Sequence, residues 1–289
     1  MYKYNFLKYS VPSVLFTLVI IGAGVASYFV QGGFRYSVDF AGGTEMRVQF
    51  ERAVDLEAVK AVIHDQWQGT VYGVIGTPEI IVRVQEMPEK VDGLSDKILT
   101  SINSVSSENP GKLVQINSIS RTISDKLWMV WLKAITIALL SLVAYLSMRF
   151  QFAFAIGAVI ALAHDAVIVL ACFMLLGKEI SIDFIGAIMA VLAYSINDTI
   201  IVFSRIRQNM KTLKGKSLYD IVNISLNERL RRTILTSFAT ALVVVSLFVF
   251  GGESIRDFAL AILLGIVFGT FSSIYIASPI MMLFMRSQK

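Results

Sequence analysis

The chain has 289 residues, of which 55% are hydrophobic and only 16% are charged. This composition is too apolar for an ordinary soluble domain. The net charge of +5 does not require a nucleic-acid partner, because the basic excess lies in short segments beside apolar runs.

Six apolar runs are long enough to cross the hydrocarbon core of a bilayer, which takes about 20 residues. The first run is too long for a cleaved signal peptide, and no small-x-small cleavage site precedes the polar segment after it. The last run is overlong and is expected to bend near Pro279. The sequence therefore predicts a polytopic membrane protein with spans near 11–30, 128–148, 152–176, 184–204, 233–250 and 257–285.

The distribution of Lys and Arg among the short connections predicts the orientation of the spans. The loop 205–232 carries eight of these residues, and others lie near both termini. The opposite set of short loops holds only Lys178 and Arg256. By the positive-inside rule, both termini and the loop 205–232 are cytoplasmic. Within that loop, the amphipathic stretch 217–232 predicts a helix that lies along the cytoplasmic surface.

A polar stretch of nearly a hundred residues, 31–126, separates the first two spans and is long enough to fold alone. Its apolar spacing alternates between strand-like and helical, and Asp55 is the expected N-cap of the first helix. The order strand, helix, strand, strand, helix, strand predicts a ferredoxin-like domain. The expected strands are 44–50, 70–76, 79–85 and 112–119, and the expected helices are 55–67 and 91–105.

The predicted fold class is an α-helical polytopic membrane protein, with six transmembrane helices and one α+β ferredoxin-like extracytoplasmic domain. Residues 1–30 form the cytoplasmic N-terminus and the first transmembrane helix. The extracytoplasmic domain spans 31–126, and a five-helix transmembrane bundle spans 127–289. At the start of the domain, Asp39 precedes Gly42 and Gly43, a pair that permits a backbone path closed to other residues. Taken alone, this motif favours a tight turn.

Three polar insertions interrupt the apolar spans. They are His164-Asp165 in the third span, Asn197-Asp198 in the fourth, and Arg231-Arg232 at the start of the fifth. A carboxylate in hydrocarbon costs about 3 kcal/mol or more, so these acids should face a bundle interior or a wet cavity. Such groups carry protons or ions or hold a buried arginine; the alternative is a structural polar contact between helices.

Helix rise allows the depths of these groups to be compared, at about 1.5 Å per residue. Asp165 is expected roughly 20 Å from the cytoplasmic end of its helix, and Asp198 within about 10 Å of that side. A direct contact between the two acids is therefore not expected, whereas Arg232 can reach the level of Asp198. A pair that opens and closes would change the proton affinity of the carboxylate, whereas a permanently closed pair would leave it ionised and inert.

The same residues do not support a metal or cofactor site. His64 lies in the soluble domain and the single cysteine, Cys172, lies inside a span, so neither a His-rich nor a Cys-rich metal site can be assembled. A hydrogen-bonded polar cluster is the favoured interpretation of His164-Asp165, with a proton relay as one candidate role. The chain also lacks G-x-S-x-G, G-x-x-x-x-G-K and H-E-x-x-H motifs, which argues against an ATPase or protease.

Five motifs, in this order along the chain, resemble one family. They are VDFAGGT (38–44), AHD (163–165), YSINDTIIVFSRIR (194–207), RRTILTS (231–237) and the stretch from FGGESIRDF to IASP (250–279). Together they are similar to the smaller polytopic subunit of the bacterial SecD–SecF export factor, within the resistance-nodulation-division (RND) superfamily. Ser204 and Gln208 depart from the Asp and Glu that such relatives often carry, which puts contacts of the cytoplasmic loop in doubt.

The resemblance implies a subunit of a bacterial inner-membrane machine that uses the proton gradient, rather than ATP, to promote late steps of protein export. Its implied partners are SecD in a heterodimer, the SecYEG channel with its accessory subunits, and exported polypeptides. By motif, Asp198 is the implied transport carboxylate and Arg232 its partnering base, with Asn197 and the His164-Asp165 pair as supporting polar groups. The rival interpretations are a small-molecule or lipid exporter of the same superfamily, and a non-transporting scaffold.

Overall fold

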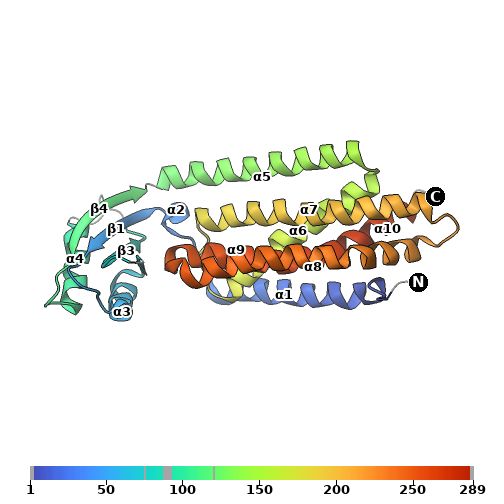
Figure 1. Cartoon of the computed structure of the whole chain (residues 1–289). Coiled ribbons are helices and arrows are strands. Elements are labelled where there is room, and N and C mark those ends of the chain that lie inside the picture. Colours follow the sequence, from blue (N-terminus) through green and yellow to red (C-terminus); the bar gives the residue numbers. More distant parts are fainter. Residues whose placement is uncertain (1–2, 75, 87–92, 120, 287–289) are drawn as a thin grey trace.

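The computed structural model describes residues 3–74, 76–86, 93–119 and 121–286. Figure 1 shows a bundle of long helices with a small mixed domain at one end, and the two termini at the other end. These two ends are called the domain end and the terminal end below.

In the described part of the chain, six helices are long and apolar enough to cross a membrane. This confirms the predicted six spans and a multi-pass membrane protein. The last span is interrupted by a π-helical turn, η2 (Ser273–Ala277), between α9 (Gly252–Ser272) and α10 (Ser278–Arg286). The other five are α1 (Ser10–Gln31), α5 (Arg121–Arg149), α6 (Phe152–Leu175), α7 (Ile182–Thr212) and α8 (Leu218–Phe250).

The core of the bundle is formed where α6, α7 and α9 pack together. Small residues allow this close approach: a Cβ on Gly265 of α9 would lie 2.0 Å from Cγ2 of Val191 on α7. In contrast, α5 contacts α6 and the short helix α2 (Val38–Ala41), and its apolar side chains, such as Ile137 and Leu140, are exposed. The outer helices therefore offer apolar surface to lipid or to another protein.

The small domain has the predicted ferredoxin-like order. Its four strands form an antiparallel sheet in the order β2-β3-β1-β4, and buried side chains such as Met46 and Val48 alternate with exposed ones along β1. The Asp55 carboxylate accepts hydrogen bonds from the backbone N–H groups of Glu57 and Ala58, so the predicted N-cap is confirmed. The elements are β1 (Gly43–Gln49), α3 (Leu56–Trp67), β2 (Thr70–Gly73), β3 (Glu79–Val84), α4 (Leu94–Val105) and β4 (Lys112–Ile119).

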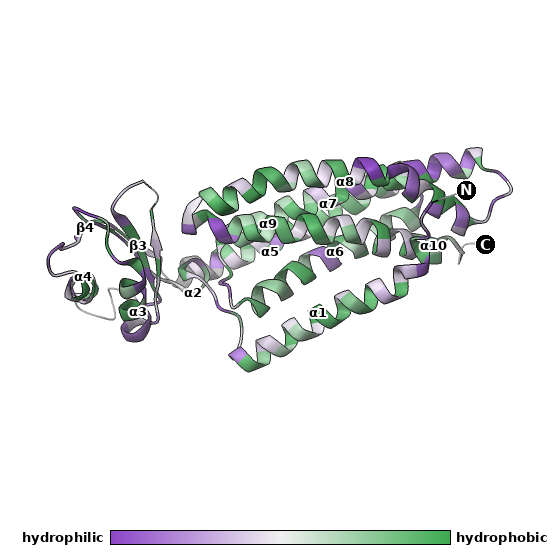
Figure 2. Ribbon diagram, turned by 60° about the horizontal axis from the view of Figure 1, so that its bottom comes forward, coloured by the Kyte–Doolittle hydropathy of each residue, from purple (hydrophilic) through white to green (hydrophobic). Residues whose placement is uncertain are grey.

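The predicted surface helix at 217–232 is wrong. This stretch is the first half of α8, which continues without a break from Leu218 to Phe250, and only residues 213–217 connect it to α7. The chain has no Gly or Pro between 218 and 250 that would interrupt the helix. Figure 2 shows hydrophilic residues gathered on α7 and α8 at the terminal end, where the two helices face each other. Within this stretch Asn223 and Ser225 are buried against protein, whereas Glu228, Arg231 and Arg232 are exposed.

Close to Pro279, where a bend was expected, the last span changes helix type. Proline has no N–H and its ring crowds the carbonyl four residues earlier, so regular α-helical bonding cannot run through this point. The turn η2 ends two residues before Pro279, and the Ser278 hydroxyl donates to the Ser273 carbonyl at 3.0 Å. This π-helical turn lies at mid-bundle, next to the polar groups described below.

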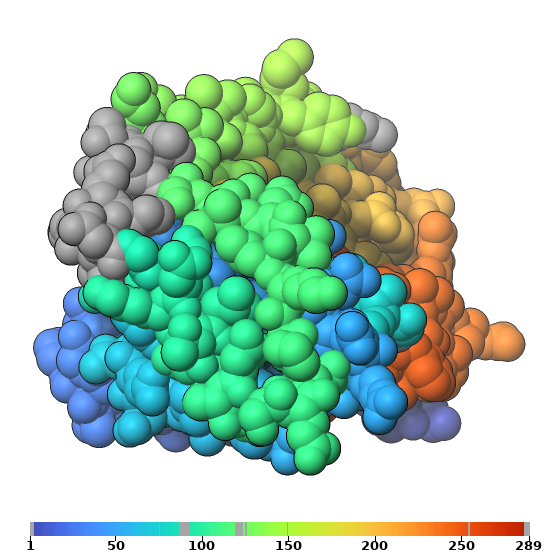
Figure 3. All heavy atoms as spheres, turned by 90° about the vertical axis from the view of Figure 1, so that its left-hand side faces the viewer, coloured from blue at the N-terminus to red at the C-terminus, as the bar shows by residue number. Residues whose placement is uncertain are grey.

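Two ion pairs lie where the small domain and the connections of the domain end meet the bundle. Lys60 of α3 contacts Glu253 at the start of α9 at 2.7 Å, and Lys178 contacts Asp257 at the same distance. The Gly73 backbone N–H also donates to Glu253, at 3.3 Å. Figure 3 looks onto this end of the molecule, with the small domain in front of the bundle. A cavity of about 1350 Å³ lies between domain and bundle.

Candidate functional site

Asp198 lies in the interior of the bundle, with only 5% of its surface exposed. Thr233 of α8 donates its hydroxyl to Oδ1 at 2.8 Å, and Ser273 of η2 donates to Oδ2 at 2.9 Å. No Lys or Arg nitrogen among the described residues lies within 4.0 Å of this carboxylate. Two neighbouring helices therefore hold the acid through hydroxyl groups, without a cation in contact.

Arg232 precedes Thr233 on α8 and so lies at the level of Asp198, as helix rise predicted. Its side chain is exposed, and no ion pair joins it to Asp198 in the described structure. The pair that the sequence analysis considered is thus open. Rotation about the long Arg side chain, or a shift of α8, is needed to close it.

Asn197 does not join the site. It is adjacent to Asp198, but its side chain is exposed on the outside of the bundle. Successive residues of an α-helix point about 100° apart, and here Asp198 faces the interior while Asn197 faces outward. The interior neighbour on the same helix is Ser195, one turn away and fully buried.

Asp165 forms a second buried cluster one turn from the first. Its Oδ2 accepts hydrogen bonds from the hydroxyls of Ser195 on α7, at 2.5 Å, and of Ser272 at the end of α9, at 2.8 Å. Its Oδ1 lies 3.1 Å from Nδ1 of His164. Because Ser195 is three residues from Asp198 on α7, the two acids differ in depth by about 4.5 Å. This is less than the difference of about 10 Å that counting from the helix ends gave.

The smaller difference in depth has a structural reason. The fourth span was expected to end near residue 204, but α7 continues to Thr212, so its terminal end is no measure of membrane depth. The acids do not contact each other directly, as expected. They are instead bonded by adjacent residues of the sixth span, Ser272 and Ser273. These serines and Thr233 were not among the predicted site residues.

Asp39, Gly42 and Gly43 lie away from this site, at the domain end. The Asp39 carboxylate accepts hydrogen bonds from the Ser37 hydroxyl at 2.9 Å and from the Ile182 backbone N–H, at the start of α7, at 3.3 Å. Both glycines have positive φ, and a Cβ on Gly43 would lie 2.3 Å from the Val84 carbonyl oxygen. The motif therefore fixes the joint between the first span, the small domain and α7.

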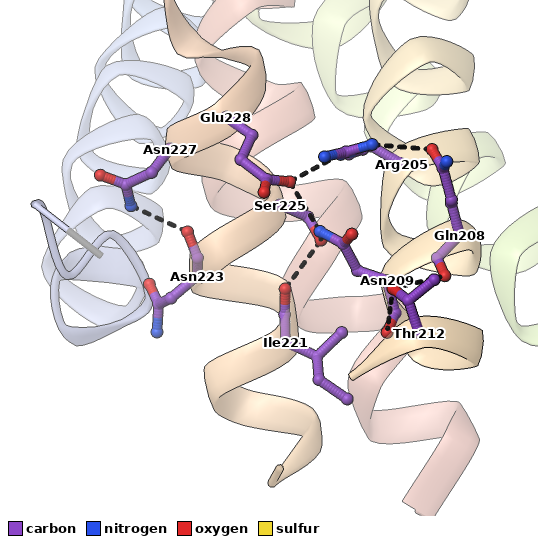
Figure 4. Close-up of polar contacts among 9 residues, drawn as sticks. All are labelled: Arg205, Gln208, Asn209, Thr212, Ile221, Asn223, Ser225, Asn227 and Glu228. Atoms are coloured by element: carbon purple, nitrogen blue, oxygen red, sulfur yellow. Dashed lines mark hydrogen bonds and ion pairs between the residues drawn. The ribbon is translucent and has the colours of Figure 1, made fainter. Parts of the chain in front are cut away.

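A third polar cluster joins α7 to α8 at the terminal end (Figure 4). Glu228 accepts hydrogen bonds from Arg205 at 2.6 Å and from Asn209 at 2.7 Å. Gln208, one of the two departures noted in the sequence, accepts a hydrogen bond from Arg205 at 2.8 Å. On the same stretch of α8, Asn227 pairs with both the N–H and the carbonyl of Tyr4, which attaches the N-terminal segment to α8.

These elements and contacts define a polytopic membrane protein of the transporter type, with acidic side chains buried at mid-bundle and one small ferredoxin-like domain. No group of three or more His, Cys, Asp or Glu side chains in the described ranges is arranged to hold a metal ion.

Comparison with known proteins identifies the family. The description "Protein export membrane protein SecD/SecF, C-terminal" matches residues 99–287, and "SecD/SecF GG Motif" matches residues 28–54. The protein translocase subunit SecF of Magnetococcus marinus is 36% identical over 287 residues, covering 97% of this chain and 91% of that protein. The protein translocase subunit SecDF of Thermus thermophilus is 32% identical, covering 99% of this chain and 39% of that protein.

A crystal structure of SecDF from Thermus thermophilus, titled a translocon-associated membrane protein, superposes with a TM-score of 0.81 at 30% sequence identity. The match covers 98% of this chain and 39% of that one, so the chain spans about two-fifths of the solved protein. The chain belongs to the SecD/SecF family of protein-export membrane proteins. A role in Sec protein export follows, and the small-molecule or lipid exporter is not favoured.

Proposed function

We propose that this chain is the SecF-type half of a SecD–SecF pair, which uses the proton gradient to promote late steps of protein export. Asp198 is the group that takes up and releases the proton, and Arg232 is its partnering base. The observation that carries this proposal is a buried carboxylate held by two hydroxyls, with an exposed arginine at the same level that makes no ion pair within the described residues.

Hydroxyl partners suit a group that changes its charge. A Ser or Thr hydroxyl donates to an ionised carboxylate, and its oxygen can accept a hydrogen bond from a carboxylic acid. An arginine in permanent contact would instead keep the acid ionised. The open arrangement of Asp198 and Arg232 therefore supports a cycle in which the pair closes when the proton leaves and opens when it returns.

The exposed polar groups at this level support an obligate partner. Asn197, Arg231 and Arg232 are exposed on this chain alone, although they lie on helices of membrane-spanning length. Lipid cannot satisfy such groups, so a protein neighbour is required. A second six-span half of similar fold meets this need. In the matched SecDF protein, the part similar to this chain makes up about two-fifths of the length, which supports a neighbouring half in the same assembly.

The proposed orientation places the terminal end in the cytoplasm of a bacterial cell and the small domain, 31–126, outside the inner membrane. The eight basic residues between 205 and 232 support this placement. The SecYEG channel, its accessory subunits and exported polypeptides are proposed partners of the assembled complex. The proposed role is transport rather than enzymatic catalysis.

The decisive experiment compares wild type with Asp198→Asn, which keeps the shape and most hydrogen bonds of the side chain but not its charge. Both are assembled with SecD and the Sec channel in vesicles at equal abundance. Export that depends on the proton gradient should be lost, whereas ATP-driven insertion should remain. Asp183→Asn, an exposed acid in the first turn of the same helix at the domain end, is the matched control. Equal gradient-dependent export from wild type and Asp198→Asn would refute the proposal.

A further inference from the structure

The second buried acid has its own arrangement for binding a proton. Asp165 is fully buried and is contacted by His164 from its own helix, Ser195 from α7 and Ser272 from α9. Among the described residues, His164 is the one ionisable group in contact with it. The imidazole is itself largely buried, and its Nε2 atom has no hydrogen-bond partner in the described part of the chain.

The 3.1 Å between Nδ1 and Oδ1 requires one hydrogen between these two atoms, because two bare acceptors would repel each other. With a single proton, the pair consists of an imidazole protonated at Nδ1 and an ionised carboxylate. A second proton can bind at Nε2 of His164, which has no hydrogen-bond partner in the described part of the chain, while Oδ2 accepts the two hydroxyl hydrogens. The shared hydrogen between Nδ1 and Oδ1 remains in place throughout.

Hydroxyls of two consecutive residues bond the two acids, and no hydrogen bond joins these hydroxyls to each other in the described part of the chain. Ser272 donates to Asp165 and Ser273 donates to Asp198, through Oδ2 in both cases. Each hydroxyl has one hydrogen and a second acceptor in reach: the Gly269 carbonyl at 3.1 Å for Ser272, and the Thr270 carbonyl at 2.9 Å for Ser273. Each hydroxyl can therefore turn from the carboxylate to its own helix.

The two acids also act on each other through their charge. They lie about one helical turn apart in an interior of low dielectric constant, so ionisation of both is unfavourable. Two interacting sites of this kind titrate as a unit rather than independently. The π-helical turn begins at Ser273, the residue whose hydroxyl donates to Asp198, and such turns occur frequently at functional sites.

We propose that His164 and Asp165 form a second proton-binding pair within this site. The consecutive residues Ser272 and Ser273 bond the two acids, and the charges of the acids link the protonation of the pair to that of Asp198, so that a proton bound at one site favours release from the other. Proton binding by the pair stands on its own geometry; its place in the transport cycle rests on the proposed function of Asp198.

The test of proton binding uses the two histidines of the chain. His64 is exposed in the small domain, so His64→Gln leaves His164 as the single histidine of this subunit. This variant, with ¹⁵N-labelled histidine, is assembled with unlabelled SecD in lipid bilayers and titrated by solid-state NMR. We expect the Nε2 signal to change from the unprotonated to the protonated form as pH falls. An Nε2 signal that keeps one form throughout the titration would overturn the proposal and indicate a purely structural contact.

The link to Asp198 is tested by a second pair of measurements. Ser272→Ala should shift the midpoint of the Nε2 titration, and so should Asp198→Asn, although Asp198 does not contact the histidine. An unchanged midpoint in Asp198→Asn would disprove the link. Retention of SecD during purification, compared with wild type, shows that each variant is assembled.

Export provides the functional readout. Asp165→Asn should lower gradient-driven export about tenfold or more, because loss of a group that transfers protons typically slows its step by about 10² or more. If Asp198→Asn abolishes this export and Asp165→Asn leaves it unchanged, the second pair has no part in the cycle while the proposed function stands. If Asp198→Asn has no effect, the proposed function fails, and the NMR titration still decides whether the pair binds a proton.

Discussion

Two polar clusters join α7 to α8, and they hold a carboxylate in opposite ways. At the terminal end, Glu228 contacts the guanidinium of Arg205 at 2.6 Å, and both side chains are partly exposed. At mid-bundle, Asp198 is bonded by hydroxyls alone, and Arg232 remains apart from it. Asp198, the more deeply buried of these two carboxylates, is therefore the one without a cation in contact among the described residues.

The presence of a cation beside Glu228 and its absence beside Asp198, in the part of the chain that the structure describes, indicate different roles for the two clusters. A partly exposed Arg–Glu pair stays charged over the physiological pH range, so it attaches one helix to the other without responding to protons. A buried acid with hydroxyl partners can be satisfied in either protonation state. Burial without a cation is unfavourable for stability, and it persists where the group has a role in transport.

Removal of the arginine should have the largest effect on function. We expect Arg232→Ala to abolish gradient-dependent export, as Asp198→Asn does, because the carboxylate then has no base with which to pair. The abundance of the variant should change little, since the side chain is exposed and unpaired here. Arg232→Lys keeps the charge but not the planar guanidinium, and should retain part of the activity. Full gradient-dependent export by Arg232→Ala at equal abundance would show that Asp198 works without this partner.

The terminal-end cluster should respond in the opposite way. Glu228→Gln removes the ion pair with Arg205 but leaves an amide oxygen for Asn209, so the free energy of unfolding should fall by about 1 kcal/mol or less. Thermal unfolding of the purified protein measures this loss. Gradient-dependent export at equal abundance should match wild type. A loss of export as severe as that of Asp198→Asn would show that the comparison between the two clusters is mistaken.

Local patterns were sufficient for the elements of the small domain. The N-cap Asp55 and the alternation along 44–50 depend on neighbours in the sequence, and the structure reproduces both. The stretch 217–232 was misinterpreted because its amphipathic pattern is the same whether the apolar and polar faces meet lipid and water or another helix. Only the packing of α7 against α8 distinguishes these cases.

The site was predicted in part for a similar reason. Asp198 and Asp165 were found because a carboxylate in an apolar run is costly and therefore conspicuous. Ser272, Ser273 and Thr233 were missed, because a Ser or Thr in such a run usually bonds to its own helix and has no distinctive spacing. Their role depends on α8 and α9 lying beside α6 and α7, which no local pattern specifies.

Glu179, an acid outside the spans, is intermediate between these two cases, because it is partly buried but contacts no cation within the described ranges. Its substitution should give the smallest effect of the changes considered, a small shift in the free energy of unfolding. Glu179 lines the cavity below the small domain. Burial raises the pKa of its carboxyl, and the nearby charge of Arg83 opposes that shift without forming an ion pair with it in the described structure. The ionised form of Glu179 is thus disfavoured, although this group is closer to water than the acids at mid-bundle.

The raised pKa gives a definite sign to the pH dependence. The contribution of Glu179 to the free energy of unfolding is fully present below its unfolded-chain pKa of about 4.3, and it is lost as pH rises through the higher folded-state pKa. Glu179→Gln cannot ionise, so it should be slightly more stable than wild type at neutral pH and equal to it in acid. Melting temperatures measured across this pH range test the prediction. A variant that is less stable than wild type at neutral pH would show that the ionised carboxylate is favoured by Arg83 or Arg35 more strongly than burial disfavours it.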